Sequence, residues 1–457
     1  MPKLLFSEFR SSNKDTWKKQ AEKELKENYT DATSWEISHN LFVDSYYTAK
    51  DTDNERTKEL QDCQKKIPGW HNIPVIQFDT SWSVNAKIIS SLESGANAIV
   101  LDLEENDLMK SELSKTLHAV KLCETPIYFK TSINTEDLVE EISRQAGCDL
   151  KGGIYNDPLA NWMRAGIGFP QIPDSLYLTL NRTKMMREFR PLMIESHVYH
   201  NAGADVVQEL TFLLASTVHY LDIFTDAGIS PLQALNCFFY SVSIGPNYLT
   251  EIAKLRALRF LYRKISRAYQ VPDTQCEVFV HAQTSSFYNA VQSPHTNIIR
   301  SASEAMSAVI GGCDGITVQA FDHSFLQTSE FSKRIAGNIS PLLAYESYFD
   351  RVADPAAGSY QLEIMSLNIA DAAWDLFLVT EEKGGLIRCF EEGFIHAEIE
   401  KSWQKKVTAL NNGKNITGTN DYKSDNKSTH LPQNTDFKNN ILNSQTLPVR
   451  NLSELLL

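Results

Sequence analysis

Eight short apolar runs, rich in strand-forming residues, recur through the middle of the chain, and helical segments separate most of them. The runs cover residues 74–79, 98–103, 126–131, 152–157, 191–198, 237–243, 276–284 and 315–322. Helical spacing of apolar residues covers 83–95, 106–122, 134–147, 204–227, 247–269, 297–311 and 328–343. Near-continuous apolar character is typical of strands buried on both faces of a parallel sheet. Roughly eight strand–helix units within about 250 residues predict an α/β fold, a closed (β/α)8 TIM barrel. An open doubly wound sheet is the competing interpretation, but it usually has fewer strands.

The flanking regions differ from the barrel in composition and divide the rest of the chain. Residues 1–70 are polar and charged and hold one amphipathic helix, which Asp15 or Thr16 could cap, so they are predicted to form an N-terminal arm. The barrel is placed at residues 71–345 and a C-terminal helical segment at 346–408. Residues 409–457 offer almost nothing to bury, which predicts a disordered polar tail, although the final "LSELLL" could dock as a short helix.

The net charge and the cysteines indicate which binding partners and which cellular compartment to expect. The net charge is -13 without a dense basic run, so nucleic acid is not an expected partner, whereas a small anion is compatible. The seven cysteines include no C-x-x-C pair and are expected to be free thiols in a reducing compartment. The N-terminal apolar run is too short for a signal peptide, and no run of about 18 apolar residues occurs. We therefore expect a cytoplasmic protein without membrane contacts.

Polar side chains at the ends of the predicted strands are the site candidates, because barrel active sites form where strands end and βα loops begin. The candidates are Asp79, Asp102, Lys130, Asn156, Asp157, His197, His200, His281, Gln283, Thr284, Asp322 and His323. No metal site is expected, because the H-x-x-H of His197 and His200 supplies two ligands at most. The chain also has no G-x-S-x-G elbow and no phosphate-binding glycine loop. The basic residues 254–264 are interpreted mostly as a solvated helix face, from which Arg256 or Arg259 could turn toward an anion.

Several segments resemble, in order and spacing, the methylmalonyl-CoA mutase family. The segments are "IESHVYHNAGADVVQEL", "EIAKLRALRFL", "HAQTSS", "IIRSASEAMSAVIGG" and "DPAAGSYQLE". The resemblance extends to about residue 405, and the N-terminal "FRSSNKDTWKKQAEKELK" with its lone barrel is similar to the small, or beta, subunits of the bacterial family members. It implies a (β/α)8 barrel whose bore, lined by small side chains, admits the pantetheine arm of coenzyme A.

Three departures from the family pattern indicate that this barrel has lost its active site. The large subunits carry a histidine against the migrating thioester carbonyl, and alignment on "NAGA" places Val198 at that position, with His197 and His200 on either side. An isopropyl group cannot polarise a carbonyl. The segment before that strand lacks a clear match to the carboxylate-binding arginine, and His323 stands where the large subunits have a glutamate near the adenosyl group. We therefore expect no catalytic residue in this chain.

The resemblance also implies a cofactor and a partner. The family interconverts methylmalonyl-CoA and succinyl-CoA with adenosylcobalamin, which the large subunits bind through a D-x-H-x-x-G domain after the barrel. This chain has no D-x-H, so no cobalamin-binding domain is expected in it. Adenosylcobalamin is instead expected in the large (alpha) subunit of a heterodimer, around which the N-terminal arm wraps.

Two other possibilities are kept open. The expected remnant of a substrate site, with weak acyl-CoA affinity at most, consists of His281, Gln283, Thr284, Ser285 and Arg256. The alternative function is an autonomous barrel enzyme that performs acid/base or metal-assisted chemistry with His197 and His200, together with Asp157 and Asp322.

Overall fold

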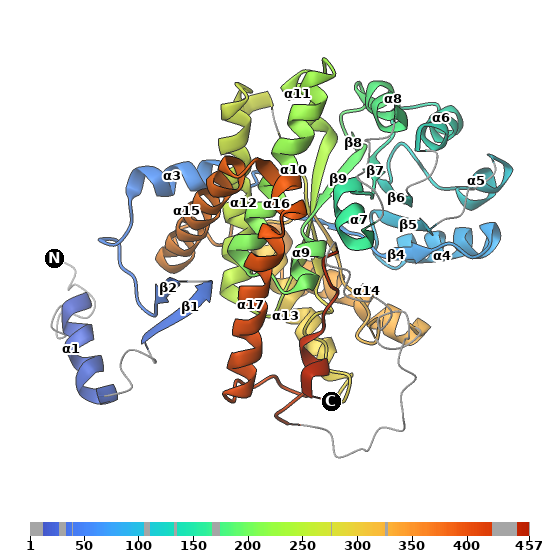
Figure 1. The fold of residues 1–457 in the computed structure, drawn as a ribbon. Coiled ribbons are helices and arrows are strands. Elements are labelled where there is room, and N and C mark those ends of the chain that lie inside the picture. Colours follow the sequence, from blue (N-terminus) through green and yellow to red (C-terminus); the bar gives the residue numbers. More distant parts are fainter. Residues whose placement is uncertain are drawn as a thin grey trace, which may run out of the picture.

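The predicted strands all form, and they close into a parallel barrel (Figure 1). The computed structural model describes residues 12–26, 33–38, 40–104, 110–131, 135–166, 174–275, 277–324, 328–422 and 446–456. Two parallel five-stranded sheets run in the orders β3-β12-β11-β10-β9 and β4-β5-β6-β7-β8. The strands are β3 (His71–Asn72), β4 (Val75–Gln77), β5 (Ile99–Glu104), β6 (Ile127–Thr131), β7 (Gly152–Ile154), β8 (Phe189–Arg190), β9 (Leu192–Glu195), β10 (Phe238–Ile244), β11 (Val280–Thr284) and β12 (Gly315–Thr317).

Two prolines explain why one barrel contains two sheets. β3 and β4 are pieces of one strand on either side of Pro74, and β8 and β9 are pieces of another on either side of Pro191. Proline has no N–H to donate to a ladder, so each strand is interrupted where it passes from one sheet to the other. Because the sheets share these two interrupted strands, the barrel is closed and the predicted fold class is confirmed.

Helices between the strands form the outer layer of the barrel. They are α4 (Ser81–Glu93), α5 (Lys110–Thr116), α6 (Thr135–Ala146), α7 (Pro158–Ala165), α8 (Asp174–Thr183), α9 (His197–Ala202), α10 (Val206–Asp226), α11 (Pro231–Cys237), α12 (Tyr248–Ala268), α13 (Thr296–Ile310) and α14 (Glu330–Tyr345). All seven predicted helices are present, although α5 is shorter than predicted and residues 106–109 lie outside the described ones. The short helices α7, α8, α9 and α11 were not predicted.

The fifth predicted strand is too long by three residues, and this error affects the site. The strand ends at Glu195, and α9 begins at His197 after Ser196 turns the chain with φ -95° and ψ -8°. The apolar pattern of "LMIESHV" cannot distinguish a strand from a buried helical turn. His197 and His200 therefore lie on one short helix, and neither belongs to a strand or a loop.

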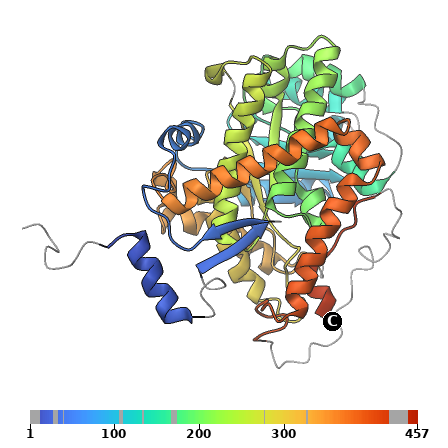
Figure 2. The ribbon, with the colours of Figure 1, turned by 60° about the vertical axis from the view of Figure 1, so that its left-hand side comes forward.

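The two halves of the barrel are covered unequally. The α-helices described after the barrel are α15 (Tyr360–Glu382), α16 (Gly385–Glu391) and α17 (Phe394–Asn411). α15 packs against α10 and α12, so the β9–β12 half carries an additional layer, which Figure 2 shows crossing the barrel helices. The β4–β8 half is covered by α4–α8 and has a smaller core of its own (Figure 1).

Part of the predicted N-terminal arm belongs to the main body. The segment contains α1 (Lys14–Leu25), the antiparallel pair β1 (Ser34–Ser38) and β2 (Leu41–Asp44), and α3 (Asn54–Asp62). Val43 and Leu60 are fully buried in the main core, against α10, α12 and α15. α1 contains no buried residue, and its N-cap is Asn13, whose side chain accepts a hydrogen bond from the Thr16 backbone at 2.9 Å, so neither predicted cap is used.

The predicted disordered tail, residues 409–457, is wrong for residues 409–422, where α17 continues to Asn411 and Leu410 is buried, and for residues 446–456. Leu447 and Leu452 are buried, and the residues Leu452–Leu456 form a 3-10 helix. The Leu452 backbone donates to the carbonyl of Phe287 at 3.0 Å, and the Ser453 hydroxyl donates to that of Asn289 at 2.7 Å. A few apolar residues are therefore enough to anchor this segment, which we call the C-terminal strap. The polar residues 423–445 lie outside the described part of the chain.

The expectation that every cysteine is a free thiol is also wrong. Cys123 and Cys148 form a disulfide, 25 residues apart in sequence. They lie in the loops that precede β6 and β7, which are neighbouring strands, so the barrel brings them together without any spacing motif. The described residues contain no helix long and apolar enough to cross a membrane.

Candidate functional site

Apolar side chains fill the bore of the barrel toward the amino-terminal ends of the strands. Ile73, Ala98, Val100, Tyr128, Met193 and Phe239 form one buried cluster with Tyr155 and Phe279. These residues come from strands all around the barrel, so their side chains can only meet inside it. The rings of Tyr128 and Phe239 have centroids 5.3 Å apart, and those of Tyr155 and Phe239 6.1 Å. We call this cluster the aromatic layer.

Gly315 shows how tightly the aromatic layer is packed. A Cβ atom at this position would lie 2.5 Å from Cδ1 of Ile73 and 3.3 Å from Cζ of Phe279. The first distance is well inside van der Waals contact, so a methyl group would fit only if the end of the Ile73 side chain shifted. The small residue at this position therefore accommodates Ile73 and Phe279 and does not widen the bore.

A polar network lies above the aromatic layer, toward the carboxyl ends of the strands. The hydroxyl of Ser241 lies 2.7 Å from Nε2 of His197, 2.8 Å from Nδ1 of His281 and 2.9 Å from the hydroxyl of Tyr155. Nε2 of His281 lies 2.8 Å from the hydroxyl of Thr317, which donates to the Ile73 carbonyl at 2.6 Å.

If both imidazoles are neutral, the Ile73 carbonyl fixes the direction of the hydrogen bonds from Thr317 to Ser243. Because the Thr317 hydroxyl donates to that carbonyl, it must accept from Nε2–H of His281, whose Nδ1 then accepts from Ser241. Ser241 can then only accept from Nε2–H of His197, whose Nδ1 lies 2.6 Å from the Ser243 hydroxyl and accepts from it. This is the pattern that two neutral imidazoles give, and it occupies all four of their ring nitrogens.

The electrostatics agree with neutral imidazoles. Burial lowers the pKa of His197 to about 4, although the charge of Glu195 opposes this shift. Burial also lowers the pKa of His281 to about 3, and His197 adds to that effect. Both side chains are nearly inaccessible, with 6% and 2% of their surface exposed. An imidazole that stays neutral at pH 7 and has no free nitrogen cannot act there as an acid, a base or a metal ligand.

His200 belongs to a second buried cluster, beside α10 and α12. Its Nδ1 lies 2.8 Å from Glu209 and its Nε2 lies 2.7 Å from the hydroxyl of Ser285. Lys254 pairs with Glu209 at 3.2 Å and with Glu251 at 2.6 Å. Burial opposes ionisation of Glu209, but Lys254 and His200 outweigh it and lower the pKa of this carboxyl. The two histidines of the H-x-x-H sequence thus bind different partners and do not form a metal pair.

The open mouth of the barrel carries paired charges. Lys130, half of whose side chain is exposed, donates to the buried Asp102 at 2.7 Å, and Arg164 forms an ion pair with Glu195. Asp157 begins α7 and accepts from the hydroxyl of Tyr220 at 2.6 Å. Burial, together with the charge of Glu195, raises the pKa of Asp157 to about 6.

The other predicted mouth residues are scattered. Asp79 pairs with Lys87 on α4, and Asn156 accepts from Asn161 at the start of α7. Within the described part of the chain, Oδ1 of the buried Asp322 has no hydrogen-bond partner, and the adjacent His323 is exposed.

Four of the five expected substrate-site residues lie together, and Arg256 does not. His281 belongs to the polar network, Ser285 binds His200, and the Thr284 hydroxyl accepts from the Gln319 backbone at 2.8 Å. Gln283 is half-buried at the mouth, 3.5 Å from the hydroxyl of Tyr155. Arg256 is 1% exposed and forms an ion pair with Asp354, next to the start of α15 and away from the bore.

The basic face predicted on α12 is not solvated at its first positions. Lys254, Arg256 and Arg259 are buried, because neighbouring elements cover α12. Their carboxylate partners come from several places: Glu209 and Glu251 pair with Lys254, Asp354 with Arg256 and Asp314 with Arg259. Val198 is also buried, at 4% exposure, and belongs to the apolar core and not to the polar network. Val198, the predicted counterpart of the family's histidine, is thus a packing residue.

Sequence reasoning missed most of the residues that complete these clusters. Ser241, Ser243 and Thr317 lie within runs that were interpreted only as buried strands. One signal was available: the two serines are two positions apart in "CFFYSVS", as expected for polar side chains on the inner face of a strand. Nothing local indicated Glu209, which lies inside a long apolar helix.

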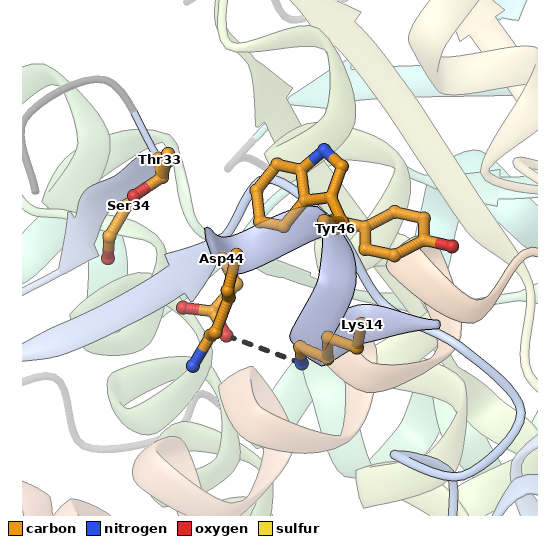
Figure 3. A pocket seen from close by; sticks show the side chains of 7 residues that line it. Lys14, Thr33, Ser34, Asp44 and Tyr46 are labelled. Atoms are coloured by element: carbon orange, nitrogen blue, oxygen red, sulfur yellow. Dashed lines mark ion pairs between the residues drawn. The ribbon is translucent and has the colours of Figure 1, made fainter. Parts of the chain in front are cut away.

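The described residues contain no group of three or more histidine, cysteine, aspartate or glutamate side chains that could hold a metal ion. A hollow of about 150 Å³ lies far from the barrel mouth, between α1 and the β1–β2 hairpin. Figure 3 shows Lys14 and Asp44 paired beside it at 3.6 Å, with Tyr46 at its edge. This hollow belongs to the N-terminal segment and does not extend the barrel site.

Comparisons with known proteins give a consistent result. A family model described as methylmalonyl-CoA mutase matches residues 137–454. The methylmalonyl-CoA mutase small subunit of Porphyromonas gingivalis is 29% identical over 92% of this chain and 71% of its own length. That of Streptomyces virginiae is 29% identical over 74% of this chain and 56% of its own length. The mitochondrial methylmalonyl-CoA mutase of Homo sapiens is 32% identical over 60% of this chain and 37% of its own length.

Proposed function

The chain belongs to the methylmalonyl-CoA mutase family, and we propose that it acts there as the small, non-catalytic subunit of a cytoplasmic heterodimer. In this proposal a larger subunit binds adenosylcobalamin and isomerises methylmalonyl-CoA and succinyl-CoA. This chain supplies a folded partner. The observation that carries the proposal is that the bore is filled.

The aromatic layer leaves no path for a coenzyme A arm along the barrel axis. Tyr128, Met193 and Phe239 are each less than 5% exposed, and a Cβ atom at Gly315 would displace the end of the Ile73 side chain. A pantetheine chain could enter only if several aromatic side chains left their positions, at a cost of several kcal/mol for each emptied site. This supports a barrel that does not bind acyl-CoA through its bore.

The side chains above the aromatic layer support the same conclusion. His281 and Ser285 spend their polar atoms on protein partners, and Val198 cannot donate a hydrogen bond to a thioester carbonyl. His197, beside Val198, is held between two serines. The alternative of an autonomous enzyme with His197 and His200 is not favoured, because the two rings serve separate clusters.

The mouth also does not fit a corrin that is held through an imidazole. The ring nitrogens of His197, His200 and His281 are all within 2.8 Å of a protein oxygen. A cobalt ion would have to displace hydrogen bonds in a buried network, which is costly.

The proposal is tested by producing this chain together with the large subunit from the same source. Gel filtration should give one complex with the two chains in equal amounts, and only the complex should convert methylmalonyl-CoA when adenosylcobalamin is added. Isothermal titration of the isolated chain with methylmalonyl-CoA should show no binding. Two separate peaks would refute the heterodimer, and turnover by the isolated chain would refute the non-catalytic role.

A further inference from the structure

The disulfide between Cys123 and Cys148 lies at the end of the barrel opposite to the mouth. Cys123 is exposed in the loop before β6, and Cys148 is half-buried in the loop before β7. Their Cα atoms are 6.0 Å apart, within the usual range for a disulfide. A dissolved thiol or disulfide can therefore reach this pair.

The other described cysteines should react poorly with a dissolved thiol or disulfide. Cys237, Cys313 and Cys389 are buried, and Cys63 is half-buried. Burial raises the pKa of Cys63 to about 11 and the pKa values of Cys237 and Cys313 to about 12, so these thiols carry almost no thiolate at neutral pH. Cys276 lies outside the described residues.

The two linked loops also carry apolar residues into the smaller core. Leu122, next to Cys123, and Leu150, near Cys148, line one small hollow together with Phe129. This core belongs to the β4–β8 half, which lacks the additional helical layer. A covalent link between the loops therefore acts on the half of the barrel with less packing to hold it.

We propose that Cys123 and Cys148 form a reversible modification site, which a small-molecule disulfide such as oxidised glutathione converts from dithiol to disulfide, stiffening the β4–β8 half. The thiolate of one cysteine attacks oxidised glutathione, which forms a mixed disulfide and releases one glutathione. The second cysteine then attacks the mixed disulfide and releases the second glutathione. The protein loses two electrons and two protons, and an excess of reduced glutathione reverses both steps.

The first test counts thiols by mass. The full chain is equilibrated with oxidised or reduced glutathione, quenched with acid, unfolded and labelled with a maleimide. Because the chain has seven cysteines and one pair is linked, we expect five labels after oxidation and seven after reduction. The Cys123→Ser/Cys148→Ser variant should take five labels in both states. The matched control Cys63→Ser should lose one label in each state and keep the difference of two.

The second test measures amide hydrogen exchange in the oxidised and reduced chain. Reduction should speed exchange in peptides that cover residues 119–131 and 147–154, and it should leave α10 unchanged. The double variant should resemble the reduced chain in both conditions. Seven labels after oxidation, or a label difference that persists in the double variant, would overturn the modification site. Equal exchange in both states would overturn the stiffening.

Discussion

Acidification from pH 7 to pH 5 should destabilise this chain through His197 and His281, and replacing either residue with glutamine should remove part of that effect. Each imidazole has an ordinary pKa of 6.5, and burial lowers it to about 4 and about 3 in the folded protein. Below pH 6.5 the two imidazoles therefore bind protons in the unfolded chain but stay neutral in the folded chain. The stabilising contribution is complete above pH 6.5 and declines as the pH falls toward the folded pKa.

The size of the effect follows from these values. Between the unfolded pKa of 6.5 and pH 5 there are about 1.5 units, each worth about 1.36 kcal/mol, so each histidine contributes a loss of about 2 kcal/mol at pH 5. Both folded pKa values lie a unit or more below pH 5, so the result depends hardly at all on their exact positions. In the polar network, a second proton on His281 would sit on Nδ1. The Ser241 hydroxyl, which now donates to that nitrogen, would then face a donor.

Buried carboxyl groups change the total pH dependence but not the comparison between variants. Asp157, whose pKa is raised to about 6 by burial and by Glu195, gains protons on folding and offsets part of the loss. This contribution is common to the parent chain and to the His197→Gln and His281→Gln variants, so it cancels in the difference.

The assay is urea unfolding, followed by tryptophan fluorescence at pH 7, 6 and 5. The free energy of unfolding should fall between pH 7 and pH 5 by about 2 kcal/mol less in His281→Gln than in the parent chain, whatever the stability of the variant at pH 7. His118→Gln, at an exposed histidine, is the matched control and should follow the parent chain. Parallel pH profiles for the parent chain and both network variants would refute neutral, buried imidazoles.

Three further predictions concern packing and buried charge. Phe239→Ala should lower the free energy of unfolding by about 3–5 kcal/mol, because it empties the centre of the aromatic layer; a loss below about 1 kcal/mol in urea unfolding would mean that the bore is not packed. Lys254→Met should cost about 3–5 kcal/mol by leaving Glu209 and Glu251 buried without their cation, and adding Glu209→Gln should recover part of that loss; no recovery would contradict the ion cluster. Leu452→Ala in the C-terminal strap should cost about 2–5 kcal/mol, whereas Leu455→Ala, at a side chain 47% exposed, should change stability by about 0.5 kcal/mol or less; equal losses would show that the strap is not docked.

The barrel was predictable from the order of residues along the chain. Strands buried on both faces must be apolar at nearly every position, so runs such as "AIVLDL" and "PLMIE" were visible without any knowledge of their neighbours. The long helices α10 and α12 were equally visible, since helical spacing is a local property. Val198 could also be predicted as the counterpart of the family's histidine, because that prediction needs only one residue in a recognisable segment.

The side chains that fill the barrel and the segments that cover it became known from the folded protein alone. A strand that is apolar throughout does not reveal which alternate residues face the bore, so the contact of Tyr128 with Phe239 and the bonds of Ser241 to two histidines could not be foreseen. The disulfide, the burial of Arg256 and the docking of Leu452 share the same cause. Each depends on a partner that is distant in sequence, and such proximity is created by the closure of the barrel and not by the local chain.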